Sequence, residues 1–197
     1  TGSSTTAQNI ISWANGQGVV LVAAAGNNNT NTMFYPAGYT QCIAVAATSS
    51  NDAKASFSNY GTWVDISAPG NNIYATTVNS TYGNMSGTSM ASPIVAGLAG
   101  LMLSLNPALS PSDIRTCITS TATNINSQNP SYTGQLGAGR INANNAMNCI
   151  AATLNWPPVA DFTANITTVT AGGSVIFTNQ SLYNPTTYSW TFQGGTP

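Results

Sequence analysis

The chain has 197 residues, of which 42 % are hydrophobic and only 4 % are charged, and its formal net charge at pH 7 is −1. This length suffices for one or two domains with a hydrophobic core, and the lack of any basic stripe argues against binding to nucleic acid. Because the sequence has no histidine and its three cysteines lack metal-binding spacing, no zinc site is expected. We also expect no cofactor for catalysis. The polar residues are mainly Asn, Ser, Thr and Gly, which suits an extracellular protein.

Predicted helices alternate with short apolar strands in the first part of the chain. Residues 5–16 have the spacing of an amphipathic helix, and the apolar run over 18–25 is typical of a strand buried on both faces of a parallel sheet. Further buried strands are predicted at 43–47 and 63–66. The alternation predicts an α/β domain with a parallel sheet.

A long apolar helix is predicted next. Met90–Leu105 is apolar on every face, which indicates a helix buried in the middle of a domain, and it is too short and too interrupted by glycine for a membrane span. Pro93 is tolerated only in the first helical turn, so the helix should begin near Thr88–Ser89. Two more helices are predicted at 110–120, with a Ser-Pro start and a capping box, and at 142–149.

The sequence pattern changes at Trp156-Pro157-Pro158. We predict a first domain over 1–153, a Pro-rich linker over 154–158 and a second domain over 159–197. Short alternating stretches at 175–177 and 188–192, set between turn residues, predict strands of a β-sandwich. Because such a sandwich takes on the order of 100 residues, the second domain is expected to be truncated and the chain to be a fragment.

The segment SGTSMASP, residues 86–93, is the candidate for chemistry. Ser89 would lie at the N-terminus of the predicted buried helix, just after Gly87, which lets a substrate backbone approach closely. Free N–H groups and the positive end of the helix dipole stabilise a developing oxyanion there, as a nucleophilic serine requires. The alternative is a helix-capping Ser/Thr pair without a catalytic role.

GTSMASPIVAG resembles the serine motif of the subtilisin family, nearest to its thermitase branch. The resemblance continues in the same order through VVLVAAAGN, YPAGY, IAVAATSS, ASFSNYGTWVDISAPG, IYAT and GAGRINANNAM, and it covers about residues 1–150. It implies part of a subtilisin-like α/β fold and a serine endopeptidase acting on protein or peptide substrates. It also implies a bacterial protein that is secreted or held at the cell surface.

The resemblance assigns roles to individual residues. Ser89 would be the nucleophile, and Asn27 would donate its side-chain amide to the oxyanion. Asn27 follows a predicted parallel strand, and ligands bind at the carboxyl ends of such strands, although a turn-forming asparagine is the alternative. The expected substrate-binding positions are Ala24, Ala25 and Gly26, which would form one wall of the specificity pocket, together with Gly87 and Thr88 beside the nucleophile.

Two positions depart from the family pattern. Phe34 stands near the pocket floor, where the family often has a small residue, and this predicts a shorter pocket that prefers smaller substrate side chains. The alternative is that Phe34 turns into the core. Ile94 stands where the family usually has a histidine that is not the catalytic base, so an apolar helix face and little effect on chemistry are expected.

The partners of the nucleophile are missing from this sequence. A serine hydroxyl needs an adjacent base, and subtilisins carry Asp, His and Ser in that order along the chain. With no histidine and no D-T-G or D-S-G segment, we expect both partners upstream of residue 1 and expect the chain alone to be inactive. Asp65, in WVDISAPG, is expected to be structural. A catalytically inactive adhesion or polymer-binding protein with the same fold is the alternative function.

Structural features of the family extend the resemblance. Cys117 and Cys149 fall on elements that lie near each other in this family, which implies a disulfide in an oxidising compartment, whereas Cys42 is expected to be an inert thiol. The family also often has a weak calcium or sodium site near the loop corresponding to residues 35–41. That site uses backbone carbonyls, so we predict only a structural cation there.

Residues 158–197 resemble the start of a PKD (polycystic kidney disease-type) domain, in the pieces PVADFTAN and YSWTFQGGTP. Such immunoglobulin-like modules often follow secreted bacterial hydrolases. They serve as spacers or contact polysaccharides and cell surfaces. Trp190 is expected in the core of the sandwich, with stacking on a ligand as the alternative.

Overall fold

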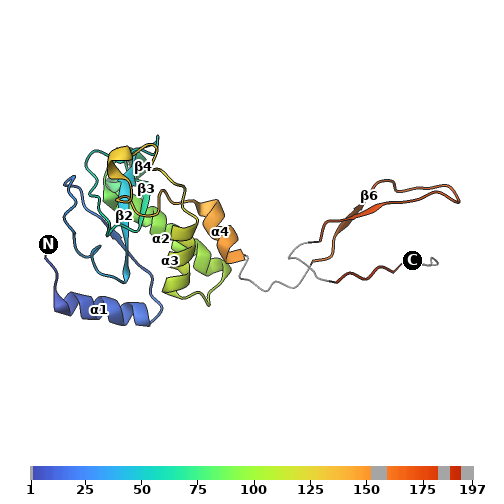
Figure 1. Cartoon of the computed structure of the whole chain (residues 1–197), viewed down its shortest axis with the longest axis horizontal. Helices are drawn as coiled ribbons and strands as arrows, with labels where there is room; N and C mark the ends of the chain where they lie inside the picture. Colours follow the sequence, from blue (N-terminus) through green and yellow to red (C-terminus); the bar gives the residue numbers. More distant parts are fainter. Residues whose placement is uncertain (1, 152–158, 182–186, 192–197) are drawn as a thin grey trace. The chain divides into compact units, whose positions relative to one another are not determined.

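The computed structural model describes residues 2–151, 159–181 and 187–191. The chain divides into two compact units, Thr1–Ala152 and Thr153–Pro197 (Figure 1). The predicted linker over 154–158 lies outside the described residues.

A three-stranded parallel sheet forms the centre of the first unit, in the order β1–β2–β3. Its strands are β1 (Leu21–Ala24), β2 (Cys42–Thr48) and β3 (Ile66–Pro69). Every residue of the central strand β2 is buried, because its side chains alternate between two covered faces. The predicted buried parallel strand at 43–47 is therefore confirmed.

Helices cover both faces of this sheet. On one face lies α2 (Thr88–Leu105), which contacts all three strands, with α4 (Ala143–Ala151) beside α2 and α3 (Pro111–Ser120) beside α4 (Figure 1). The helix α1 (Thr5–Gly16) packs its residues Ala7 and Ile11 on the opposite side, against the cluster that includes Ala23 and Ala44. The predicted helix at 5–16 is confirmed.

The helix α2 starts where the sequence predicts but is not buried all round. Ile94 and Leu101 are 37 % and 52 % exposed, because the sheet covers a single stripe of the helix. Pro93 is the sixth residue of α2, beyond its first turn, so the helical hydrogen bond to the Ser89 carbonyl cannot form. By length and composition alone α2 could cross a membrane, a test that core helices also pass, but here it packs on the sheet.

The third strand lies further along the chain than predicted. Instead of 63–66, β3 spans Ile66–Pro69 and pairs with the second half of β2. Pro69 is tolerated because it is the last residue of the strand, after which the Gly70 N–H donates to the Thr48 carbonyl at 3.0 Å. This pairing brings the chain to the end of the sheet at which α2 begins.

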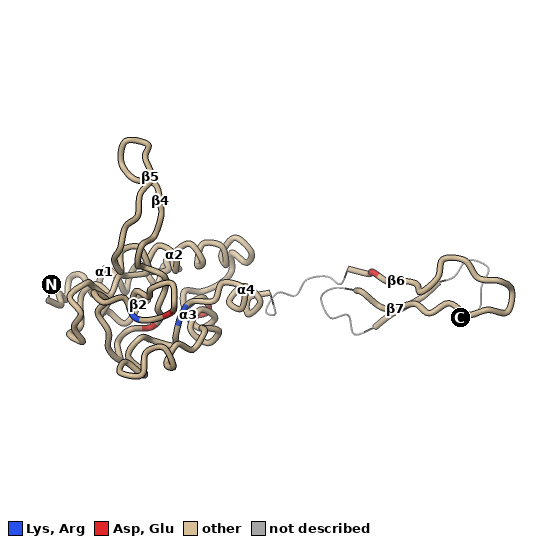
Figure 2. Tube along the Cα trace, turned by 90° about the horizontal axis from the view of Figure 1, so that it is seen from above, with Lys and Arg blue, Asp and Glu red and all other residues tan. Residues whose placement is uncertain are grey.

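A β-hairpin that the sequence analysis did not predict separates β3 from α2. Its antiparallel strands are β4 (Ile73–Thr77) and β5 (Thr81–Met85), joined by the 3-10 turn Val78–Ser80. Figure 2 shows the hairpin projecting from the body of the first unit. The residues after β5 lead directly into the candidate site at the N-terminus of α2.

The helix α3 begins with the predicted capping box. The Ser110 hydroxyl accepts from the Asp113 N–H at 3.2 Å, and the Asp113 carboxylate accepts from the Ser110 N–H at 3.0 Å. Pro111 takes the first helical position. The fourth helix, predicted at 142–149, is displaced by one or two residues at each end.

The second unit contains a short antiparallel pair, β6 (Phe162–Ala164) and β7 (Phe177–Asn179). The strand predicted at 175–177 begins instead at Phe177, and no strand forms over 187–191, while residue 192 lies outside the described residues. Trp190 contacts the rings of Phe162 and Phe177 at centroid distances of 5.2 and 5.6 Å. It remains 38 % exposed, so it joins an aromatic cluster rather than a closed core.

Candidate active site

Ser89 is the second residue of α2 and is exposed, whereas Gly87 and Thr88 before it are buried. The start of the helix is anchored by the Gly87 N–H, which donates to the Gly70 carbonyl at 2.8 Å. Neither the hydroxyl nor the backbone N–H of Ser89 makes a hydrogen bond with another described residue. The turn therefore presents an accessible hydroxyl next to an unused donor at the positive end of a helix.

Asn27 lies three residues after β1, at the carboxyl end of the sheet. Its Oδ1 atom accepts from both the backbone N–H and the hydroxyl of Thr88, each at 2.9 Å. The Thr88 hydroxyl also accepts from the Gly26 N–H at 3.1 Å, so Thr88 joins the turn to the helix. Because Oδ1 is held in this way, the Asn27 amide group points its Nδ2 donor to the other side.

The two unused donors converge beside Gly87. A methyl group built on Gly87 would lie 3.3 Å from Asn27 Nδ2 and 3.6 Å from the Ser89 nitrogen. In the protein no side chain of Gly87 fills that space, which the Met90 Sδ atom also borders at 3.6 Å. An oxygen atom there has an N–H donor on either side and the Ser89 hydroxyl on the adjoining residue. Two N–H donors near one point, beside an exposed serine hydroxyl, make this the candidate site for stabilising an oxyanion.

A buried side chain that the sequence analysis missed supports the turn around Asn27. Asn59 accepts through Oδ1 from the N–H groups of Asn28 and Thr30, at 2.9 and 3.3 Å. Its Nδ2 donates to the Ala25 carbonyl at 2.9 Å, and its backbone N–H donates to Gly26. Sequence could not single out Asn59, because an asparagine before Tyr-Gly is equally typical of an exposed turn.

The predicted wall residues lie at the end of β1. Ala24 is half-buried, and Ala25 and Gly26 are buried. Gly26 has φ +103°, where a side chain would be strained, and a methyl group there would meet Asn59 Nδ2 at 2.5 Å. The Phe34 ring lies against Gly26, with its Cγ atom 3.3 Å from the same methyl position, and it is only half-buried. The structure thus brings Phe34 to the wall formed by Ala24–Gly26.

Asp65 lies in a structural ion pair. Its carboxylate accepts from the Ala44 N–H at 2.8 Å and pairs with Arg115 at 2.5 Å. Arg115 also donates to the Thr40 carbonyl at 2.6 Å, so this pair connects α3 to β2 and to the loop before it.

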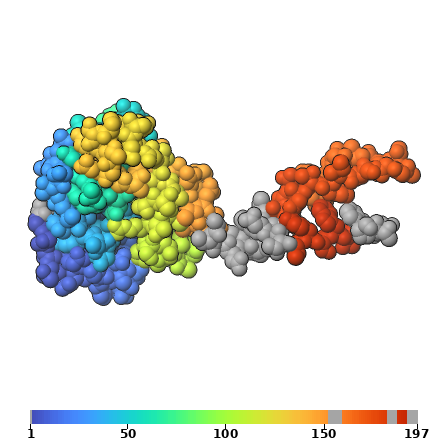
Figure 3. Space-filling view, in the orientation of Figure 1, coloured from blue at the N-terminus to red at the C-terminus, as the bar shows by residue number. Residues whose placement is uncertain are grey.

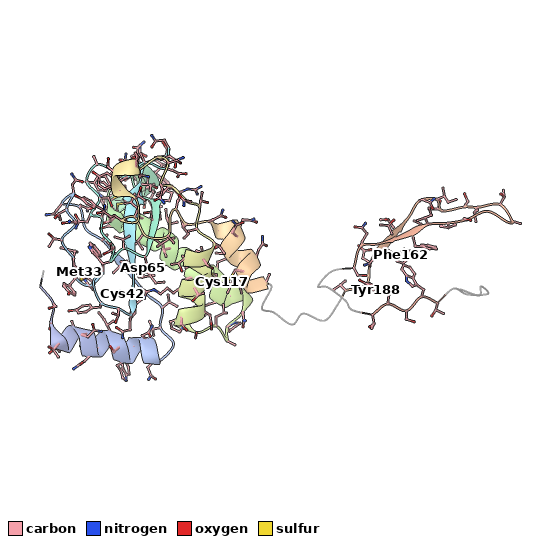
Figure 4. The ribbon with its side chains drawn as sticks, in the orientation of Figure 1. Met33, Cys42, Asp65, Cys117, Phe162 and Tyr188 are labelled. Atoms are coloured by element: carbon pink, nitrogen blue, oxygen red, sulfur yellow. A yellow bond between two sulfur atoms is a disulfide. The ribbon has the colours of Figure 1, made fainter. Side chains whose placement is uncertain are left out.

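The structure contains a disulfide between Cys117 on α3 and Cys149 on α4, and Cys117 is labelled in Figure 4. Cys42 is a buried free thiol at the start of β2, and burial raises its pKa, which makes it a poor nucleophile.

No group of three His, Cys, Asp or Glu side chains among the described residues could hold a metal ion. The predicted carbonyl site for a structural cation near 35–41 does not depend on such side chains and stays a prediction. The sequence has no histidine, the residue type expected to act as the base for Ser89.

Comparison with known proteins shows the family to which this chain belongs. The pattern of the Subtilase family matches residues 1–139, and the chain belongs to that family. Thermitase from Thermoactinomyces vulgaris is 49 % identical over 141 residues, which are 71 % of this chain and 48 % of thermitase. The thermophilic serine proteinase of Bacillus sp. (strain AK1) is 48 % identical over 143 residues, 73 % of this chain and 34 % of that protein.

Solved structures show the same fold. The patellamide maturation protease PatA superposes with a TM-score of 0.71 at 30 % identity, over 76 % of this chain and 58 % of that one. A protease from Pseudoalteromonas arctica PAMC 21717 superposes with a TM-score of 0.68 at 32 % identity, over 76 % of this chain and 48 % of that one. The first unit therefore has a subtilisin-like α/β fold. The chain spans less than half of the length of thermitase and of the Bacillus proteinase.

Proposed function

We propose that this chain is the C-terminal part of the catalytic domain of a serine endopeptidase, with Ser89 as the nucleophile. The observation that supports it is the convergence of two unused donors, Asn27 Nδ2 and the Ser89 N–H, on the open space beside Gly87. A helix-capping role for Ser89 would instead have its hydroxyl accept from a backbone N–H of the first turn, and no such bond occurs among the described residues. The catalytic Asp and His are expected upstream in the intact protein.

The proposed reaction uses these atoms in sequence. Ser89 Oγ forms a bond to the carbonyl carbon of the substrate peptide while its proton passes to the histidine of the intact protein. The carbonyl oxygen becomes negative and is stabilised by Asn27 Nδ2 and the Ser89 N–H. The C–N bond then breaks, the leaving amine takes the proton, and water hydrolyses the Ser89 ester.

We propose that the residues around the space beside Gly87 select the substrate. Gly87 leaves room for the reacting carbonyl, and Thr88 fixes the donor Asn27. The small residues Ala24–Gly26 would line one wall of the pocket for the side chain before the scissile bond. Phe34, whose ring lies against Gly26, would shorten that pocket.

Reaction with a fluorophosphonate tests the nucleophile. The intact protein should be labelled covalently, and its Ser89→Ala variant should not be. Ser92→Ala, a change of another serine in the same helix, should leave labelling unchanged. Equal labelling of the intact protein and Ser89→Ala would remove Ser89 as the nucleophile.

A polymer-binding role without catalysis is the second candidate, and the second unit supports it. A hollow of about 500 Å³ is lined there by Phe162, Phe177, Tyr188 and Trp190, of which Phe162 and Tyr188 are labelled in Figure 4. Aromatic rings with exposed faces suit stacking on a ligand. The intact protein should be retained by insoluble polysaccharide and lose retention in Trp190→Ala if this unit is a PKD-type binding module.

The remaining expectations concern the setting of the protein. We expect it to be secreted or held at the cell surface of a bacterium, where the Cys117–Cys149 disulfide is stable. Calcium or sodium bound by carbonyls of the loop 35–41 would raise thermal stability without entering the reaction. Thermal unfolding with and without a chelator, in sodium-free buffer, tests for that cation.

A further inference from the structure

Lys54 holds an unusual position next to the turn that carries Asn27. Its Nζ atom donates to Asn29 Oδ1 at 2.8 Å and to the carbonyls of Ala55 and Ser58 at 3.1 Å each. An ammonium group has three N–H donors, so these three oxygens use all of them. One of the three belongs to the turn, and the other two belong to the loop that follows β2.

Aromatic rings complete the surroundings of this ammonium. Nζ lies 5.4 Å from the centre of the Tyr60 ring and 4.8 Å from that of Tyr132, within the range of cation–π attraction. Figure 3 shows the yellow segment around residue 130 beside teal residues at the top of the first unit. Residues far apart in the sequence therefore meet around one cation.

Lys54 differs from the other two basic side chains of the protein. Arg115 and Arg140 pair with Asp65 and Asp52, whereas Lys54 makes no ion pair with a described carboxylate. Its burial lowers the pKa of the ammonium, a cost that the carbonyl dipoles and ring faces offset. The half-buried Lys54 ammonium is therefore bound by neutral oxygens alone, and these oxygens come from the turn at Asn29 and from the loop that contains Ala55 and Ser58.

The same loop reaches the turn at further points. The Asn29 N–H donates to the Phe57 carbonyl at 2.8 Å, in addition to the bond from Lys54 to the Asn29 side chain. Asn59 binds the N–H groups of Asn28 and Thr30. The backbone on the C-terminal side of Asn27 is thus set by the loop 54–59, while the Asn27 amide is set by Thr88.

We propose that Lys54 is a positioning residue for the oxyanion donor: its ammonium, held between Asn29 and the carbonyls of Ala55 and Ser58, keeps the turn at Asn27 at the distance from Ser89 that catalysis requires. This inference rests on the proposed endopeptidase function. Lys54 touches neither substrate nor nucleophile, so its effect passes through Asn27. Because the Asn27 amide binds charge that develops only in the transition state, loss of Lys54 should lower kcat and leave KM unchanged.

The test measures peptide hydrolysis by the intact protein and uses Lys54→Met, which keeps the apolar stem of the side chain and removes the ammonium. We expect kcat to fall about three- to tenfold, a fraction of the loss from removing an oxyanion donor outright, with KM unchanged. Arg140→Met is the matched control, since it removes a positive charge that does not bind the turn, and its kcat should stay at the parent value. Thermal unfolding of each variant shows whether it is folded under assay conditions.

A double-mutant cycle with Asn27→Ala decides whether Lys54 acts through Asn27. In the Asn27→Ala background, Lys54→Met should have no further effect on kcat, because the donor that Lys54 positions is gone. An unchanged kcat in Lys54→Met, or an equal loss in both backgrounds, would overturn the proposal. If Lys54→Met does not fold, the same cycle is run with Lys54→Arg, whose planar guanidinium cannot point three donors at these oxygens.

Failure of the proposed function gives a different result in the same series. If Ser89→Ala hydrolyses the peptide as fast as the parent, the endopeptidase assignment fails and the role of Lys54 fails with it. If Ser89→Ala is inactive but Asn27→Ala is fully active, the nucleophile stands and the positioning role is overturned. Only loss of activity at Ser89 and Asn27, with the Lys54 effect confined to the Asn27-containing protein, supports the inference.

Discussion

Asn27 is the residue whose proposed contribution to catalysis can be tested most directly. Asn27→Ala removes the Nδ2 donor, and in the intact protein we expect kcat to fall about 10²–10³-fold, the loss known for such a donor in subtilisin, with little change in KM. Asn28→Ala is the neighbouring control, because no bond of the Asn28 side chain occurs among the described residues. Steady-state kinetics on one peptide compare them, and similar losses in both variants would contradict the role of Asn27.

We expect that any side chain at position 87 would abolish most of the activity without unfolding the protein. In Gly87→Ala the added methyl group would lie 3.3 Å from Asn27 Nδ2 and 3.6 Å from the Ser89 nitrogen, where the oxyanion is proposed to form. We expect kcat to fall at least as far as in Asn27→Ala, with the fold intact. Gly83→Ala in the hairpin, whose methyl group meets Thr77 at an ordinary 3.5 Å, should keep the parent rate. Full activity of Gly87→Ala would mean that the carbonyl oxygen sits elsewhere.

Phe34 is expected to set the depth of the specificity pocket. Its ring lies against Gly26 and is only half-buried, so Phe34→Gly should open space at the wall. Cleavage of a peptide series should then shift from small to large side chains before the scissile bond. A profile identical to that of the parent would show that Phe34 serves packing instead.

At the scale of single elements, the N-terminus of α3 gives stability that depends on pH. The hydroxyl and the backbone N–H of Ser110 donate to Asp113 and hold the pKa of that carboxyl below its usual value. The ionised carboxylate therefore adds stability above the unfolded-state pKa of about 3.9, and this is lost as the pH falls through the lower folded-state pKa. Asp113→Asn should be less stable than the parent at pH 7, and the difference should vanish in strong acid. Unfolding midpoints of the parent and of Asp113→Asn, measured from pH 7 down to strong acid, test this prediction. A difference between the two midpoints that does not change with pH would contradict it.

The disulfide joins the last two helices of the first unit. Cys117 and Cys149 are 32 residues apart, and a loop of that size is worth roughly 3–4 kcal/mol in the chain-entropy account. The double variant Cys117→Ala/Cys149→Ala should unfold at a lower temperature and no longer respond to reductant. Cys42→Ala should still respond, because Cys42 is free. Equal midpoints of the parent with and without reductant would show that the bond adds no stability.

At the scale of the whole molecule, the chain carries only part of the proposed catalytic machinery. The first unit presents the proposed nucleophile and both proposed oxyanion donors, which come from the end of β1 and the start of α2 and meet through Thr88. The sequence has no histidine, the residue type proposed to accept the Ser89 proton in the intact protein. Under the proposed function, the reactivity of Ser89 depends on the Asp and His expected upstream in the intact protein.

Much of this protein was determined by the sequence alone. The apolar run predicted the buried strand β2, the position of Pro93 predicted that α2 starts near Thr88–Ser89, and Ser110 with Asp113 predicted the capping box of α3, because these features follow from local sequence. The serine motif also predicts where the chemistry should lie, and that stays a prediction. Local pattern did not predict the hairpin β4–β5 or the register of β3, which depend on pairing between distant segments.

Only the tertiary structure decided how the candidate site is held together. Asn59 and Lys54 look like an ordinary turn residue and an ordinary surface lysine in the sequence, yet both bind the turn that carries Asn27. Similarly, α2 is apolar all round, but the fold covers only one stripe of it. The physical reason is that a hydrogen bond or a buried face depends on what lies opposite in space, and for these residues the opposite group is distant in the sequence.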